Sequence, residues 1–157
     1  MAHEYKATVL WVRGEAKFTD HRYSRGHVWK FDGIEIPASS APSSVRPPYS
    51  VAEAVDPEEA LVAAVSSCHM LFFLAFAAQG GFTVDRYEDA AVGVMTENER
   101  GKLFVSQVTL RPAVTFTGDK RPDENDVTAL HHRSHDECFI ANSVRSEVVV
   151  EPTFSLA

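Results

Sequence analysis

The chain has 157 residues, of which 45% are hydrophobic and 24% charged, and its 15 Lys and Arg stand against 22 Asp and Glu, for a formal net charge of −7. This length and composition predict one globular domain over residues 1–157 with a core of its own. The acidic balance argues against nucleic acid and against an anionic membrane surface as partners, because both require clustered Lys and Arg.

The first residues, Met1 to Lys6, lack the basic run and apolar stretch of a secretory signal, so we expect a cytoplasmic protein. Cys68 and Cys138 are too few to form the disulfide scaffold of a small secreted domain. The two thiols therefore need a separate explanation.

The N-terminal third predicts strands joined by long loops. Side chains alternate from Glu4 to Arg13, which indicates a strand, and a second strand follows over His27–Phe31 before the turn signal Asp32-Gly33. Residues 14–26 read as a loop between the strands. Residues 37–50 contain four prolines and five serines, which predicts a long ordered loop.

Asp56-Pro57-Glu58-Glu59 is the strongest helix start in the chain, because Asp can cap, Pro suits the first helical position and acids favour the positive end of the helix dipole. The helix is expected to end at Ala78, before Gly80-Gly81. From Ala60 onward it is apolar on nearly every side, so it must be covered all round, and a second copy of the protein is the simplest cover. Its length raises the possibility of a membrane span. The polar residues Ser66 to His69 near its middle favour a buried core helix.

The remaining segments predict strands over residues 87–96 and 103–116, joined by a hairpin loop at residues 99–102. An amphipathic helix over residues 122–137 follows, with Val127 and Leu130 directed inward, and then a strand over residues 147–150. The order β-β-α-β-β-α-β predicts an α+β fold with antiparallel pairs.

A cysteine acts as a nucleophile only as the thiolate, which requires a neighbouring cation or hydrogen-bond donors. The candidate cations for Cys68 are Arg25, Arg46 and His69. His69 is a poor direct partner, because successive helical residues point about 100° apart. A packed core histidine is the simpler reading of His69.

A metal site is the competing interpretation. His131, His135 and Cys138 follow the spacing i, i+4, i+7, so one helix face could present all three to zinc, with a carboxylate or water as fourth ligand. No CxxC or HExxH pair supports this reading, and a histidine-rich solvated face is the alternative. The sequence also lacks the glycine-rich motifs of nucleotide cofactors.

Three motifs together resemble the OsmC/Ohr family of thiol-dependent hydroperoxide reductases. They are the segment from Asp56 to Cys68, the helix end Gly80-Gly81-Phe82, and Cys138-x-x-Ala141-Asn142. The resemblance implies an OsmC-like fold in which antiparallel sheets surround a long buried central helix. It also implies an intertwined homodimer with two active sites at the subunit interface.

The resemblance assigns roles to particular residues. Cys68 matches the cysteine that attacks the peroxide, Cys138 the resolving cysteine, and Glu58 the glutamate at the helix start. The arginine is Arg46 by the OsmC-type pattern and Arg25 by the Ohr-type pattern, and we expect Arg46. Phe139-Ile140 stands where many Ohr proteins have proline, which favours the OsmC-like branch.

The activity implied is reduction of organic hydroperoxides to alcohols through a sulfenic acid on Cys68 and a disulfide with Cys138, with no cofactor or metal. Apolar walls are expected from Met70, Phe72 and Phe73. A dithiol, by family resemblance a lipoyl-bearing protein, would regenerate the thiols. Two alternatives stay open: a non-catalytic binding protein of the same fold, and a zinc protein using His131, His135 and Cys138.

Overall fold

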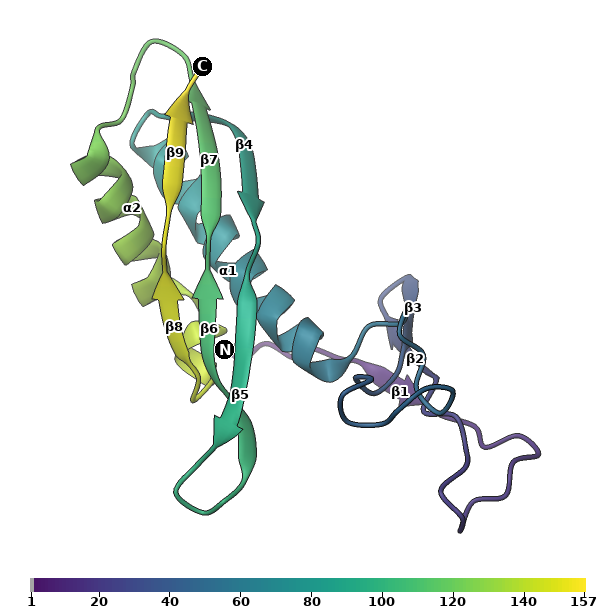
Figure 1. Ribbon diagram of the computed structural model, residues 1–157. Helices are drawn as coiled ribbons and strands as arrows, with labels where there is room; N and C mark the ends of the chain where they lie inside the picture. Colours follow the sequence, from purple (N-terminus) through teal and green to yellow (C-terminus); the bar gives the residue numbers. More distant parts are fainter. Residues whose placement is uncertain (1) are drawn as a thin grey trace. The chain divides into compact units, whose positions relative to one another are not determined.

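The computed structural model describes residues 2–157 and divides into two compact units, Met1–Ala60 and Leu61–Ala157. The first unit consists of short strands and loops, and the second contains the long strands and both long helices (Figure 1). The expectation of a single domain over residues 1–157 stays a prediction.

The first unit contains a small antiparallel sheet of order β1-β2-β3. Its strands are β1 (Thr8–Leu10), β2 (His27–Phe31) and β3 (Ile34–Ala38). The strand expected over residues 4–13 is only three residues long, and all three are exposed, so the alternating pattern there marks no buried face. Strand β3 was not expected, because Pro37 suggested a loop. Pro37 pairs with Val28 in an edge strand, where a missing N–H is tolerated.

Helix α1 (Pro57–Gln79) begins as predicted. The N–H of Glu59 donates to the Asp56 carboxylate at 2.8 Å, and the N–H of Asp56 donates back to the Glu59 carboxylate at 3.3 Å. These two reciprocal bonds complete a capping box. The helix ends one residue beyond the predicted Ala78, and Gly81 closes it with a φ of 77°. A left-handed glycine in this place is a common helix end.

The second unit contains two three-stranded sheets, of orders β4-β7-β9 and β5-β6-β8, with α1 crossing behind them in Figure 1. The elements are β4 (Thr83–Asp89), β5 (Val92–Glu97), β6 (Leu103–Leu110), β7 (Pro112–Thr117), α2 (Glu124–Glu137), the short 3₁₀ helix η1 (Ala141–Ser143), β8 (Glu147–Val150) and β9 (Thr153–Leu156). Pairs β4–β7 and β5–β6 are antiparallel as expected. Pairs β6–β8 and β7–β9 are parallel, so the sheets are mixed, because the chain returns after α2 in the same direction as β6 and β7.

Each of the two long strands expected from the sequence is interrupted. Residues 87–96 fall on β4 and β5, and residues 103–116 fall on β6 and β7. The carboxylate of Asp89 lies at the break, where it accepts the backbone N–H of Arg111 at 2.6 Å and the hydroxyl of Ser66 from α1. A charged side chain with partners on other segments thus ends the regular pairing, which a pattern of β-branched residues cannot reveal.

The core lies between α1, α2 and the sheets. One cluster consists of Phe73, Ala77, Phe82, Val114, Phe116 and Val127, and the other of Val65, Val108 and Leu110. Within the single chain α1 is covered on one side only: Phe73 is fully buried, whereas Leu71 is 60% exposed. Helix α1 is also long and apolar enough to pass a test for a membrane span, a test that core helices of soluble proteins pass as well.

Candidate active site

The thiol of Cys68 lies on α1 at a mostly apolar pocket of about 470 Å³. Its lining consists of Ala64, Ser67, Cys68, Leu71, Phe72, Ala75, Phe139 and Ile140. Cys68 is half-buried, so its sulfur is accessible to a small molecule that enters this pocket. Within residues 2–157, no Lys or Arg is among the lining residues.

The walls of this pocket differ partly from those expected. Phe72 lines it, but Phe73 is fully buried in the core and Met70 does not contribute. Their place is taken by Phe139 and Ile140, and the ring of Phe139 packs edge-on against Phe72 with centroids 5.0 Å apart. The sequence signal for these two walls is the apolar Phe139-Ile140 pair after the second cysteine, which above serves only to favour the OsmC-like branch.

The thiol of Cys138 is fully buried and close enough to the thiol of Cys68 to feel it electrostatically. Its sulfur lies 4.0 Å from the carbonyl oxygen of Val65, one turn before Cys68 on α1, and it accepts the N–H of Ala141 at 3.3 Å. Burial, and then the Cys68 thiol, raise the pKa of Cys138 to about 11. The fold therefore brings the two predicted cysteines near each other, both as free thiols.

The motif Cys138-x-x-Ala141-Asn142 has a structural explanation. The Asn142 side-chain amide donates to the carbonyl oxygens of Asp136 at 2.8 Å and of Cys138 at 3.0 Å. These carbonyls lie at the C-terminal end of α2, where a helix leaves acceptors unpaired. Asn142 therefore fixes the turn that carries Cys138.

Two histidines form a buried pair next to the thiols. His69 Nε2 of α1 and His131 Nδ1 of α2 are 3.0 Å apart, and the side chains are 1% and 2% exposed. Burial lowers the pKa of His69 to about 4 and that of His131 to about 3, so both rings are neutral at neutral pH. The reading of His69 as a packed core histidine is confirmed. The solvated histidine face expected on α2 is wrong for His131.

The zinc alternative gains no support from the geometry. Among residues 2–157, no group of three or more His, Cys, Asp and Glu side chains is arranged to hold a metal ion. His131 directs Nδ1 to His69, and the Cys138 sulfur lies against the Val65 carbonyl oxygen and the N–H of Ala141. The fold thus gives two members of the proposed ligand set other partners.

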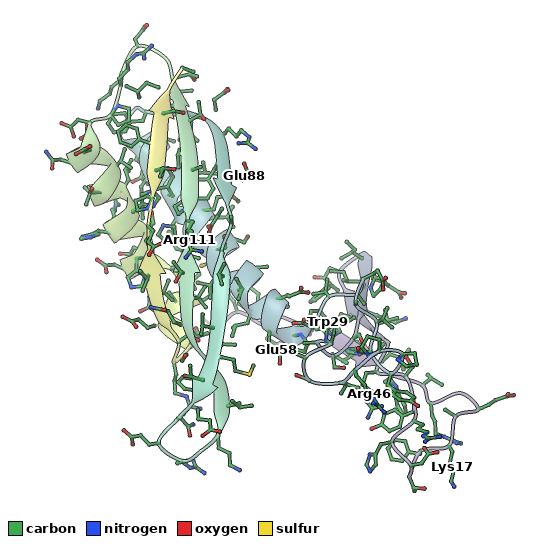
Figure 2. The ribbon with its side chains drawn as sticks, in the orientation of Figure 1. Lys17, Trp29, Arg46, Glu58, Glu88 and Arg111 are labelled. Carbon is green, nitrogen blue, oxygen red and sulfur yellow. The ribbon has the colours of Figure 1, made fainter. Side chains whose placement is uncertain are left out.

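Glu58 and Arg46 lie in the first unit (Figure 2). Glu58 is half-buried in the first turn of α1. Arg46 is exposed in the proline-rich loop, and within residues 2–157 its side chain forms no hydrogen bond or ion pair. The assignment of Arg46 as the active-site cation stays a prediction.

Arg25 is held more firmly than Arg46. Its guanidinium donates to the carbonyl oxygens of His21 at 2.7 Å and Tyr23 at 2.6 Å, and lies 3.9 Å above the centre of the Tyr23 ring. The last contact is a cation–π interaction. Arg25 lines a pocket of about 400 Å³ with Trp11, Phe18, Tyr23, His27, Ser39, Ser40 and Pro57. Pro57 is the first residue of α1, directly before Glu58. Arg25 is therefore fixed in place within the first unit, and it remains the alternative to Arg46.

Comparison with known proteins decides the family. Residues 50–153 match the model of the OsmC-like protein family. The chain belongs to this family. An OsmC-like protein of unknown function from Vibrio cholerae is 49% identical, with a TM-score of 0.95 over 97% of this chain and 100% of that one. No curated protein sequence matches the chain.

More distant structures share the fold. An OsmC-like protein from Mycoplasma pneumoniae is 16% identical, with a TM-score of 0.74 over 98% of this chain and 99% of that one. The organic hydroperoxide resistance protein OhrB of Bacillus subtilis is 14% identical, with a TM-score of 0.60 over 98% of each chain. The predicted OsmC-like α+β fold is thus confirmed.

Proposed function

We propose that this protein is a thiol-dependent peroxidase that reduces organic hydroperoxides to alcohols. The observation that carries the proposal is the position of Cys68 on the wall of an apolar pocket with the buried thiol of Cys138 nearby. Fold relatives named organic hydroperoxide resistance proteins support the substrate class. An apolar pocket favours the alkyl or aryl group of such a substrate over water and hydrogen peroxide.

The thiols differ in the way that a two-cysteine mechanism needs. Cys68 is accessible from the pocket, and its thiolate attacks the terminal oxygen of the hydroperoxide, so the O–O bond breaks and the alcohol leaves. Cys138, with a pKa of about 11, stays a neutral thiol and condenses with the Cys68 sulfenic acid. That step forms the S–S bond and releases water.

The missing cation leads us to include a second subunit in the proposal. No Lys or Arg of the second unit, residues 61–157, lines the Cys68 pocket, yet a reactive thiolate requires a cation or equivalent donors. Glu58 and Cys68 both lie on α1. Their separation of ten residues corresponds to about 15 Å along the helix axis, so Glu58 does not reach its own Cys68. We propose a homodimer in which the partner supplies Glu58 and an arginine.

A dithiol must then reduce the disulfide, and we propose a lipoyl-bearing protein for this role and the cytoplasm as the site of action. The reducing conditions of the cytoplasm keep cysteines as thiols, which suits a disulfide that forms only during turnover.

The test compares two serine variants under single-turnover conditions with an alkyl hydroperoxide. Cys68→Ser should lose peroxide consumption, since serine at its ordinary pKa is a far weaker nucleophile. Cys138→Ser should allow about one turnover per site and leave a sulfenic acid on Cys68 that a dimedone-type probe traps. Mass spectrometry of the wild type after one equivalent of peroxide should show a Cys68–Cys138 crosslink within one chain.

Equal activity of the two variants, or free thiols in the wild type after complete peroxide consumption, would overturn the proposal. An unreactive Cys68 in a folded protein would instead indicate a non-catalytic member of the family.

A further inference from the structure

The buried pair of His69 and His131 joins the two helices that carry the two thiols. His69 directly follows Cys68 on α1, and His131 lies seven residues before Cys138 at the end of α2. Seven residues are two helical turns, so His131 and Cys138 point to the same side of α2, about 10 Å apart along its axis. Helix α2 and the cysteine at its end therefore meet α1 at two places, the imidazole bond and the approach of Cys138 to the Val65 carbonyl oxygen.

The bond between the rings is directional and isolated from water. Both rings are neutral, so one nitrogen donates and the other accepts over 3.0 Å. The ring planes are 10° from parallel, and His131 also stacks on Phe73 with centroids 4.3 Å apart. His69 Nδ1 and His131 Nε2 have no hydrogen-bond partner within residues 2–157. The pair thus leaves two buried polar nitrogens unpaired, which is unfavourable for stability alone.

An apolar pair of similar volume would hold the helices together without this cost, but it would not fix their relative rotation and sliding. A single hydrogen bond in an apolar core does fix them, because any shift leaves further buried polar atoms unpaired. The position of Cys138 against α1 depends on that alignment, since its sulfur lies 4.0 Å from the Val65 carbonyl oxygen and near the Cys68 thiol.

We propose that His69 and His131 are positioning residues for disulfide formation. Their hydrogen bond sets α2 against α1 so that Cys138 reaches the Cys68 sulfenic acid. This inference rests on the proposed function. In the step concerned, the Sγ–Sγ bond forms and the Cys68 S–O bond breaks, while the Cys138 proton leaves with the hydroxyl group as water. The Cβ atoms of a disulfide lie about 3.5–4.5 Å apart, so small shifts matter.

The experiment compares two replacements with opposite properties. The double variant His69→Leu/His131→Phe retains apolar volume and removes the bond. The variant His131→Asn keeps a side-chain polar atom close to the position of Nδ1 and gives up ring volume and stacking. His132→Phe serves as the control, because His132 is the exposed neighbour of His131 on α2.

Rates are measured after one equivalent of an alkyl hydroperoxide, and free energies of unfolding are measured for each variant. We expect Cys68 oxidation at the wild-type rate in all of them. Disulfide closure should slow at least about tenfold in the apolar double variant, because misplacement of reacting groups by about 1 Å can cost 10²-fold. Over-oxidation of Cys68 at excess peroxide should rise accordingly. His131→Asn should close faster than the double variant although it is less stable.

A merely structural role predicts that closure follows stability, so closure at the wild-type rate in a folded double variant would overturn the inference. If the double variant fails to fold, His131→Phe takes its place. A peroxide-independent arm measures the Cys68–Cys138 disulfide equilibrium in dithiothreitol redox buffers, where the double variant should form the disulfide less readily. An absence of peroxide attack in the wild type contradicts the proposed function, whereas an unchanged disulfide equilibrium contradicts only the positioning role.

Discussion

The two cysteines of this chain have opposite surroundings, and the difference agrees with the roles proposed for them. Cys138 is fully buried, with a pKa raised to about 11, whereas Cys68 lies half-buried on a pocket wall. A buried protonated thiol is a poor first nucleophile but a suitable partner for a sulfenic acid that forms beside it. The burial of the two thiols thus agrees with the proposal that Cys68 attacks the peroxide and Cys138 forms the disulfide.

The first prediction at the scale of single residues concerns the cation that activates Cys68. Arg46→Ala should slow peroxide attack at least about tenfold and raise the pH at which Cys68 becomes reactive, because a cation near a thiol stabilises the thiolate. The measurement is the rate of Cys68 oxidation against pH under single-turnover conditions. Since Arg46 is exposed, the fold should be unaffected.

Arg25→Ala is the matched comparison. Arg25 is tied to two backbone carbonyls and lines the aromatic pocket near the start of α1. If Arg46→Ala keeps normal rates and Arg25→Ala loses them, the arginine assigned from the OsmC-type pattern is wrong and the Ohr-type assignment holds.

The sequence predicted the helix that carries Cys68 better than it predicted the residues that surround the two thiols. The capping motif at Asp56 and the spacing of the cysteines pointed to Cys68 and Cys138, because helix starts and short motifs are local. The wall residue Phe139 and the burial of His131 depend on how α2 packs against α1. A spacing of i, i+4 says that two residues share a helix face but not which way the face turns.

At the scale of elements, the pairing of α1 with α2 places titratable groups in an apolar layer. His69 and His131 are neutral because burial opposes their charged form, and nearby histidines act in the same direction, His135 on the pKa of His69, and His69 and then His132 on the pKa of His131. Asp89 acts in the other direction on His69. The prediction that follows concerns acid stability.

The free energy of unfolding should fall as pH drops below about 6.5. The folded pKa of His69, about 4, is below the ordinary 6.5, so the unfolded chain binds more protons and stability is lost between these values. Each pKa unit corresponds to about 1.4 kcal/mol, which gives His69 alone roughly 3 kcal/mol. Denaturant unfolding of the wild type between pH 7.5 and about 4 measures the loss.

The double variant His69→Leu/His131→Phe should show a much flatter pH dependence over the same range, and His132→Phe should behave like the wild type. A double variant that loses as much stability as the wild type between pH 6.5 and 4 would show that other groups, not the buried pair, govern acid unfolding.

The elements themselves were predicted where the signal is local and missed where it depends on distant partners. The start of α1 and strand β8 lie where the sequence placed them. The interruption of the long strands depends on Asp89, which binds a backbone N–H 22 residues away. The parallel pairing of β8 with β6 and of β9 with β7 depends on the path of the chain after α2, which periodicity does not encode.

At the scale of the whole molecule, helix α1 poses the main question. Its sequence is apolar on nearly every side, yet in the single chain Leu71 is 60% exposed and Ala63, Ala64 and Ala75 are exposed with it. Exposed apolar faces on this scale mark interaction surfaces. This face supports the proposed homodimer.

The last prediction tests that assembly. Leu71→Glu should shift the protein from dimer to monomer at micromolar concentration, because a carboxylate is costly to bury in an apolar interface. Light scattering coupled to size-exclusion chromatography measures the change, and peroxide attack should fall with the dimer fraction if the partner supplies Glu58.

Leu103→Glu is the control, since Leu103 is a leucine of β6 that is 67% exposed. A dilution series of the wild type separates loss of assembly from a local effect, because Leu71 also lines the Cys68 pocket. A wild type that is monomeric at micromolar concentration and retains full activity would rule out both the dimer and the shared site.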